Sequence, residues 1–194
     1  MTVSTKTKKI LTGGKGIVKI WDISDELESD HDNDGSSRSS SRNGSRSNLE
    51  TKEIHRLNGL PDGNYIRSCK IFSNGQKLIV GGEANKLSYW DLNASGGPTK
   101  MTDLQLQAPA CYALCIPESD NVCYACCSDG MVSVWDLRTC RPTSFQAHTD
   151  GASCVDIVNG KLWTGGLDNM VKCWDINNSS SAVASHELGA QVSS

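Results

Sequence analysis

The sequence has no long apolar run, no apolar signal segment at its start and no excess of basic charge, and each absence argues against a class of protein. No window approaches the roughly eighteen uncharged apolar residues of a transmembrane helix, so none is expected. Residues 1–14, MTVSTKTKKILTGG, lack the apolar centre of a secretory signal, so secretion is not expected either. The net charge of −3 argues against direct nucleic-acid binding, which usually requires a basic patch.

The nine cysteines do not form a convincing metal or redox motif. Cys123 and Cys126 make a C-x-x-C pair, extended by Cys127, but a zinc site would require a second pair and a redox site would be expected at a helix start. The surrounding segment NVCYACCSDG is instead typical of a strand that enters a turn, where cysteine serves as a small buried residue. We expect free, packed thiols with no metal and no cofactor; zinc and redox roles remain weaker alternatives.

A short pattern recurs along the chain: an apolar segment, a polar turn with glycine, and a strand that ends in Trp-Asp. The dipeptide occurs at Trp21-Asp22, Trp90-Asp91, Trp135-Asp136 and Trp174-Asp175. The spacings between successive tryptophans are 69, 45 and 39 residues. The last two bracket the period of about 40–45 residues that is typical of a WD40 propeller blade.

The strands within each unit follow from apolar alternation. VKIW, LSYW, VSVW and VKCW place apolar residues two apart, and the preceding turns carry the Gly, Asp and Asn that tight hairpins require. Each full unit supplies three such strands, with a fourth and more variable strand after Trp-Asp. The sequence therefore predicts an all-β fold, a WD40 β-propeller that is incomplete, with about three full blades and a partial one.

An acidic and then Ser/Arg-rich segment explains the one long spacing. Residues 25–53 contain almost no apolar side chains and cannot offset the entropy of ordering, so a disordered inserted loop is expected. The expected units are a partial blade at 1–24, the inserted loop at 25–56, blades at 57–97, 98–140 and 141–181, and the start of a further blade at 182–194. Such an open arc would leave strand edges and apolar faces uncovered, so this chain alone is expected to be marginally stable or prone to aggregation.

The last unit resembles the WD40 family most fully. In that family a histidine, a Ser or Thr, an aspartate and the Trp form a chain of hydrogen bonds, and the matching residues here are His148, Thr164, Asp168 and Trp174. A catalytic triad is the alternative for Thr, His and Asp, but no nucleophile-elbow sequence is present, so we expect a structural network and no enzyme. The other units depart from the pattern: Lys15 and Ala84 replace the turn aspartate, and Ala125 replaces the Ser or Thr.

Several longer segments go beyond what the repeat requires: NYIRSCKIF, LIVGGEANKLSYWDL, APACYALCI, CCSDGMVSVWDL, HTDGASCVDI and KLWTGGLDNMVKCWDI. Together with LTGGKGIVKIWDIS they resemble the C-terminal propeller of the Groucho/TLE transcriptional corepressors, over nearly the whole chain apart from residues 1–9 and the inserted loop. The family resemblance implies that a complete ring has seven blades. It also implies a nuclear, non-enzymatic scaffold without DNA contact of its own. Its partners would be DNA-bound repressors, captured through short Trp-Arg-Pro-Trp or Phe-containing peptides across the central opening.

The resemblance also implies a peptide site. Tyr65, Arg67 and Glu83 match positions that line the opening, and Tyr112 and Ser153, at the start of the corresponding strands of the next two blades, are weaker candidates. An aromatic ring would accept a ligand Trp or Phe, Glu83 would pair with a ligand Arg, and Arg67 would meet a carboxylate or carbonyl oxygen. Taken alone, YIRS is equally typical of a strand edge with an extended arginine.

Two other functions remain open from the sequence. One is a general WD40 interaction scaffold in another pathway, because the fold by itself does not define a partner. The other is a truncated form that lacks, or competes with, the activity of a longer protein.

Overall fold

The structure is a computed structural model, and it describes residues 2–4, 9–22, 52–57, 60, 64–176 and 178–193. Within these ranges the chain forms sixteen strands in four antiparallel sheets of four strands each, with no helix. The described residues accordingly offer no helix with the length and hydropathy of a membrane span. The expectation of an all-β, incomplete propeller is confirmed.

Each sheet is a meander of four consecutive strands. The first sheet consists of β1 (Thr2–Ser4), β2 (Lys9–Gly13), β3 (Val18–Asp22) and β4 (Lys52–Leu57). The second consists of β5 (Ile66–Ile71), β6 (Lys77–Gly82), β7 (Lys86–Asp91) and β8 (Thr99–Gln105). The third consists of β9 (Cys111–Cys115), β10 (Val122–Cys127), β11 (Met131–Asp136) and β12 (Arg141–Gln146). The fourth consists of β13 (Ala152–Val158), β14 (Lys161–Gly166), β15 (Met170–Asp175) and β16 (Asn178–Glu187).

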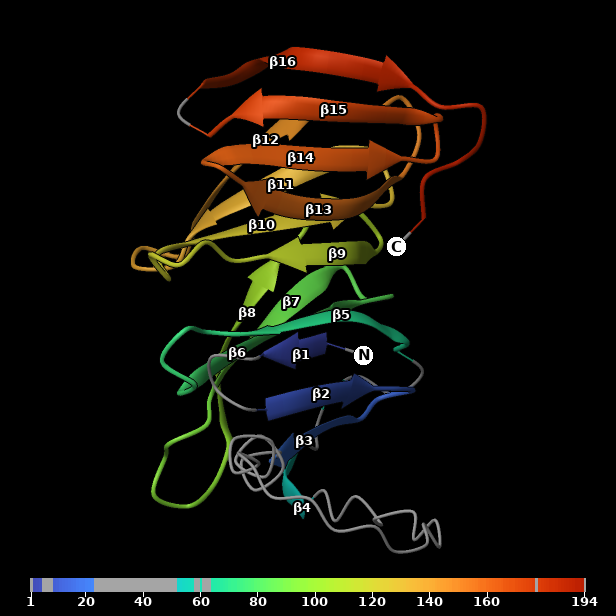
Figure 1. Cartoon of the computed structure of the whole chain (residues 1–194). Coiled ribbons are helices and arrows are strands. Elements are labelled where there is room, and N and C mark those ends of the chain that lie inside the picture. Colours follow the sequence, from blue (N-terminus) through green and yellow to red (C-terminus); the bar gives the residue numbers. More distant parts are fainter. Residues whose placement is uncertain are drawn as a thin grey trace, which may run out of the picture.

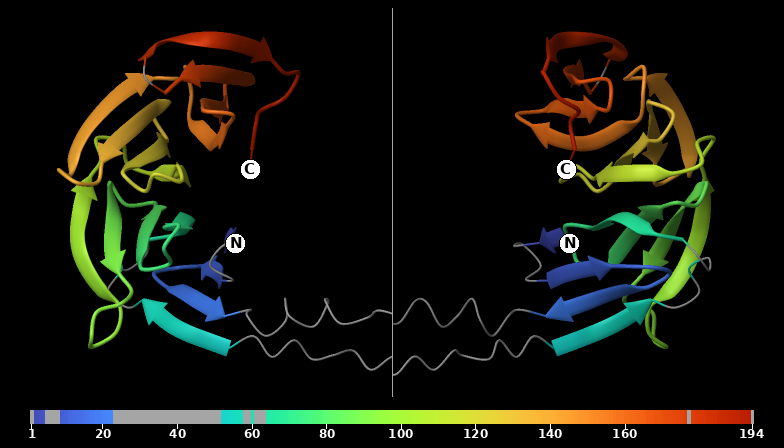
Figure 2. Two further views of the ribbon diagram at one scale, coloured as in Figure 1. Left: turned by 60° about the vertical axis from the view of Figure 1, so that its left-hand side comes forward. Right: turned by 90° about the vertical axis from the view of Figure 1, so that its right-hand side faces the viewer.

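The four sheets follow one another around an arc, as Figures 1 and 2 show. The first strand of each sheet lies on the concave side of the arc, and the last strand lies on its outer side. Both chain ends lie near the open side of the arc (Figure 2). This arrangement gathers β5, β9 and β13 around one inner surface, where the candidate site lies.

The hydrophobic core is divided into three clusters, one between each pair of neighbouring sheets. Each of the last three Trp-Asp tryptophans packs against the preceding sheet. Trp90 lies in the cluster between the first and second sheets, Trp135 in the next, and Trp174 in the last. The recurring tryptophan is therefore the residue that joins one sheet to the one before it.

The C-x-x-C cysteines are packing residues, as expected. Cys123 belongs to the cluster between the second and third sheets and Cys126 to the cluster between the third and fourth, because residues three apart in a strand point to opposite faces. Both thiols are fully buried, and burial raises the pKa of each. In the described ranges no cysteine forms a disulfide, and no three Cys, His, Asp or Glu side chains converge in a way that could hold a metal ion.

Four expected unit boundaries differ from the sheets. The first sheet has a short inner strand, β1, and an outer strand, β4, so residues 52–56 are strand rather than inserted loop. β4 forms because Ile54 and Leu57 pack into the core cluster between the first and second sheets. The rest of the expected loop, residues 25–51, lies outside the described residues. β8 and β12 belong to the preceding sheets, and residues 182–187 lie in β16, because hydrogen bonding and not the sequence period sets where a sheet begins.

Candidate functional site

A backbone bulge marks the same place in three of the inner strands. The pairing of β5 with β6 skips Arg67, the pairing of β9 with β10 skips Tyr112, and the pairing of β13 with β14 skips Ser153. A bulge inserts one extra residue and turns its side chain out of the regular alternation. The three candidates that the sequence placed at strand starts are thus equivalent residues on one rim of the concave surface.

Arg67 and Glu83 form an ion pair on this rim. Nη2 of Arg67 donates to Oε1 of Glu83, and the two side chains are 52% and 35% exposed. The Glu83 amide in turn donates to the Tyr65 carbonyl at 3.1 Å. The structure therefore brings Tyr65, Arg67 and Glu83 together, at the start of β5 and the turn after β6.

Tyr65 presents its ring to solvent. Its exposure is 51%, and the ammonium of Lys15 lies 5.9 Å from the ring centroid. Lys15 also bridges to Tyr65 through the backbone, so it belongs to the site. In the sequence Lys15 stands at the place of the repeat's turn aspartate, and no motif signals its contact with the aromatic ring.

Gly82 lets the backbone segments of the site approach closely. A Cβ at this position would collide with the carbonyl oxygen of Tyr65 and with Oδ1 of Asn64. Only glycine at position 82 therefore allows the Glu83 amide to reach the Tyr65 carbonyl. This close approach is sufficient to explain Gly82, and no contact with a ligand is needed.

A hollow of about 420 Å³ extends from this rim along the inner strands. It is lined by Gly13 and by residues 66–70, 112–114 and 154–155. Arg67 and Tyr112 both line it, while Tyr65 and Glu83 stand beside it. The site thus combines an exposed aromatic ring, an ion pair and a polar concave surface.

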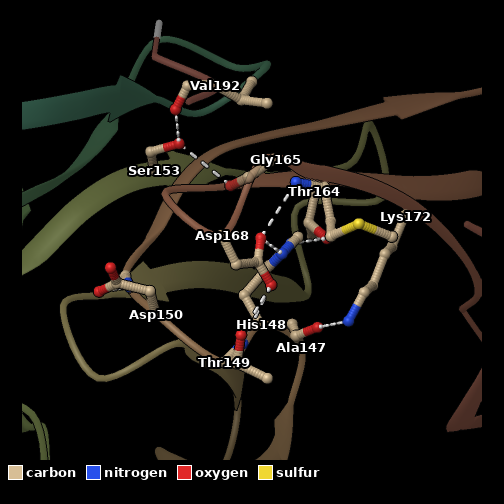
Figure 3. A network of polar contacts seen from close by, with 12 residues as sticks. Ala147, His148, Thr149, Asp150, Ser153, Thr164, Gly165, Asp168, Lys172 and Val192 are labelled. Carbon is tan, nitrogen blue, oxygen red and sulfur yellow. Dashed lines mark hydrogen bonds and ion pairs between the residues drawn. The ribbon is translucent and has the colours of Figure 1, made fainter. Parts of the chain in front are cut away.

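Ser153 is placed out of solvent. It is buried, and its hydroxyl lies within hydrogen-bonding reach of the Gly165 carbonyl, at 3.1 Å, and of the Val192 carbonyl (Figure 3). The Val192 amide donates to the Gly166 carbonyl at 3.2 Å, so the last described residues cover this position. Of the equivalent rim residues, Arg67 is exposed and Tyr112 is half-buried, whereas Ser153 is covered by the segment that contains Val192.

The expected hydrogen-bond chain is present in the fourth sheet, and Figure 3 shows its His148, Thr164 and Asp168 part. Trp174 Nε1 donates to the Thr164 hydroxyl at 2.9 Å, and that hydroxyl lies 2.8 Å from Nε2 of His148. Nδ1 of His148 lies 2.9 Å from the Asp168 carboxylate. A carboxylate only accepts, so Nδ1 carries the proton and a neutral ring accepts from Thr164.

Burial and these contacts set the ionisation of the pair. Burial lowers the pKa of His148, against the opposing effect of Asp168. Burial disfavours the Asp168 anion, but the Thr149 amide and His148 outweigh it and hold the pKa of this carboxyl below its usual value. The Thr164 hydroxyl is buried and already bonded on both sides, so it is placed as a structural link and not as a nucleophile.

The other three sheets keep only parts of this chain. In the first sheet, Trp21 Nε1 donates to the Thr12 hydroxyl at 2.9 Å. In the second and third sheets Val80 and Ala125 stand at the corresponding place, and among the described residues Nε1 of Trp90 and of Trp135 has no hydrogen-bond partner. Within the described part of the chain, packing between sheets therefore holds these two tryptophans.

The structure is that of a WD-repeat β-propeller protein. Its four meander sheets form an arc, the last three Trp-Asp tryptophans pack between neighbouring sheets, and the fourth sheet contains a buried hydrogen-bond network of His, Thr, Asp and Trp. Residues 104–136 and 139–175 match the family described as "WD domain, G-beta repeat". The chain is also similar to Transducin-like enhancer protein 2 of Mus musculus, with 43% identity over 195 residues and 99% of this chain covered. It belongs to the Groucho/transducin-like enhancer family, and it spans 22% of the length of that relative.

Proposed function

We propose that this chain is a peptide-recognition part of a nuclear transcriptional corepressor. Its ligands would be short segments of DNA-bound repressors, of the Trp-Arg-Pro-Trp or Phe-containing type, and the chain itself would make no DNA contact. The observation that carries the proposal is the grouping of Tyr65, Arg67 and Glu83 on the rim of the inner hollow. Family membership supports the corepressor role, and the net charge of −3 agrees with recognition of a protein rather than of DNA.

The chemistry of the site fits such a peptide. The half-exposed Tyr65 ring offers a flat surface on which a ligand Trp or Phe can stack. A ligand arginine can take Glu83 as a carboxylate partner, which frees Arg67 to meet the peptide carboxyl end or a carbonyl oxygen. The existing ion pair holds both side chains in place before binding, so little additional side-chain ordering is needed.

Photo-crosslinking tests where a peptide lies. A Trp-Arg-Pro-Trp peptide with a benzophenone side chain in place of one tryptophan would be irradiated with the purified chain, and the linked residues identified by mass spectrometry. The proposal predicts links to residues 65–67, 82–83 and 112. Links confined to the outer strands β8, β12 or β16 would refute it.

A charge-reversal pair distinguishes this site from a general scaffold surface. Glu83→Lys should abolish the specific links and the binding of an arginine-containing peptide. Glu118→Lys is the matched control, because Glu118 is an exposed carboxylate in the loop at the opposite end of β9. If both variants retain partner binding equally, a WD-repeat scaffold with a different interaction surface is the better description.

A further inference from the structure

The third sheet has a hollow beside three of the four positions at which the fourth sheet has its buried hydrogen-bond chain. The ends of β8 and β12 correspond, because each carries a glutamine whose Nε2 donates to the carbonyl of the preceding hairpin turn. Gln105 reaches Asn85 at 2.6 Å, and Gln146 reaches Asp129 at 3.3 Å. Two residues further along the chain, Gln107 therefore stands at the position of His148.

The hydroxyl of the chain is missing in the third sheet as well. Ala125 stands at the position of Thr164. Cys123 pairs with Trp135 and Leu162 pairs with Trp174, and Ala125 and Thr164 each come two residues after these pairing partners. Asp129, in the turn between β10 and β11, stands at the position of Asp168. The third sheet thus keeps the two ends of the chain, an indole and a carboxylate, and lacks the ring and the oxygen between them.

A hollow of about 140 Å³ lies here. Its lining includes Gln107, Asp129, Ser133, Trp135 and Ser144. Trp135 is only 4% exposed and its Nε1 has no partner among the described residues, whereas Asp129 and Ser144 are exposed and open the hollow to solvent. A buried donor without an acceptor is costly, so a group that supplies one would be bound favourably.

We propose that this hollow is a binding site for a neutral imidazole ring, either a small heterocyclic molecule or a histidine side chain of a partner protein. The ring would donate one N–H to the Asp129 carboxylate. Its other nitrogen would accept from a water molecule whose oxygen accepts the Trp135 N–H, in the order found in the fourth sheet. A water molecule needs only about 10–15 Å³ of such space, so most of the hollow remains for the ring. The inference is independent of the peptide site on the inner rim.

The test follows the indole N–H resonances of the ¹⁵N-labelled chain by NMR, assigned through single Trp→Phe variants. Imidazole would be added at about pH 8, where the ring is neutral. The expected result is a saturable shift of the Trp135 resonance with a Kd on the order of millimolar, as for other very small ligands. Trp90, whose indole is also unpartnered but does not line this hollow, should not shift.

Two matched comparisons complete the test. Pyrrole has the same ring size and a donor N–H but no acceptor nitrogen, so it should leave Trp135 unshifted. Gln107→His, at an exposed position, should place a ring of the protein in the hollow and remove the response to imidazole. Ala125 does not line the hollow, so Ala125→Thr should keep the response to imidazole.

N-acetylhistidine N-methylamide distinguishes the two sources. A Trp135 shift with both this compound and imidazole indicates that a partner histidine fits, and a shift with imidazole alone indicates a free heterocycle. The proposal is overturned if imidazole leaves Trp135 unshifted, if pyrrole acts equally, or if Gln107→His retains the full response.

Discussion

The guanidinium of Arg67 pairs with the carboxylate of Glu83 on the rim of the inner hollow, and both side chains remain open to solvent. An exposed ion pair of this kind contributes little to folding, typically about 0–1 kcal/mol. It nevertheless fixes two opposite charges beside the exposed ring of Tyr65. The pair is therefore better explained by recognition than by stability, and this distinction can be measured.

Substitutions of the pair should separate binding from folding. Arg67→Ala and Glu83→Ala should each change the free energy of unfolding by less than about 1 kcal/mol, because both side chains are solvated. Glu83→Ala should weaken binding of a Trp-Arg-Pro-Trp peptide by about tenfold or more, which corresponds to loss of one charge-assisted hydrogen bond. Urea denaturation and calorimetric titration measure the two effects, with Glu118→Ala as the control. A large loss of stability without loss of affinity would assign the pair to the fold.

Thr164→Val should destabilise the fourth sheet more than Thr12→Val destabilises the first. The Thr164 hydroxyl serves both Trp174 and His148, so its removal leaves two buried polar atoms unpaired. The Thr12 hydroxyl serves Trp21, which is only half-buried. We expect losses of about 2–3 kcal/mol and about 1 kcal/mol in the free energy of unfolding. Equal losses in urea denaturation would show that the histidine contact contributes nothing.

Val80→Thr should be stabilising, in contrast to most buried substitutions of this type. The new hydroxyl would stand at the place that corresponds to Thr164 and would accept a hydrogen bond from Nε1 of Trp90, which has no partner among the described residues. We expect a gain of about 0.5–1 kcal/mol, the net value of one hydrogen bond. Val132→Thr is the control. Val132 lies in the core cluster between the third and fourth sheets, which contains neither Trp90 nor Trp135, so a buried hydroxyl there should lower the free energy of unfolding. Loss of stability in both variants would contradict the assignment of the vacant acceptor position.

Stability should fall as the pH decreases below the ordinary histidine range. Burial lowers the pKa of His148 below its unfolded value of 6.5, and burial and Lys9 lower that of His55. Between the folded and unfolded pKa values the unfolded chain binds more protons, so stability rises with pH. The contribution is complete above 6.5 and is lost as the pH falls through the folded pKa.

Urea denaturation at about pH 7.5 and pH 5.5 measures this dependence. His148→Gln should reduce the difference between the two conditions, and His55→Gln should remove a further part. Asp168 stays ionised throughout, because its pKa lies below 3.8. An unchanged pH dependence in His148→Gln would contradict a neutral buried ring.

Local patterns in the sequence were sufficient for much of the fold and for the buried chain. A tight turn before an apolar strand is a short-range signal, and it located the hairpins that carry the four Trp-Asp pairs. His148, Thr164, Asp168 and Trp174 match the WD40 family's pattern within one repeat, so that resemblance was sufficient to predict their hydrogen bonds.

Features that depend on distant contacts could not be predicted in this way. β4 pairs with β3 across a long intervening segment, and Val192 covers Ser153 from 39 residues away. Lys15 reaches the Tyr65 ring from another sheet, where no repeat pattern applies. The grouping of Tyr65, Arg67 and Glu83 was implied by family resemblance and not by periodicity, because a bulge takes Arg67 out of the regular alternation.

A fluorescence-anisotropy titration of a labelled Trp-Arg-Pro-Trp peptide against the purified chain tests the peptide-recognition proposal most directly. A scrambled peptide and two variants, Tyr65→Ala and Met101→Ala, provide the comparison; Met101 is an apolar residue of similar exposure on the outer strand β8. The account predicts saturable binding of the specific peptide that Tyr65→Ala removes and Met101→Ala retains. Equal binding of the scrambled peptide, or specific binding unaffected by Tyr65→Ala, would contradict it.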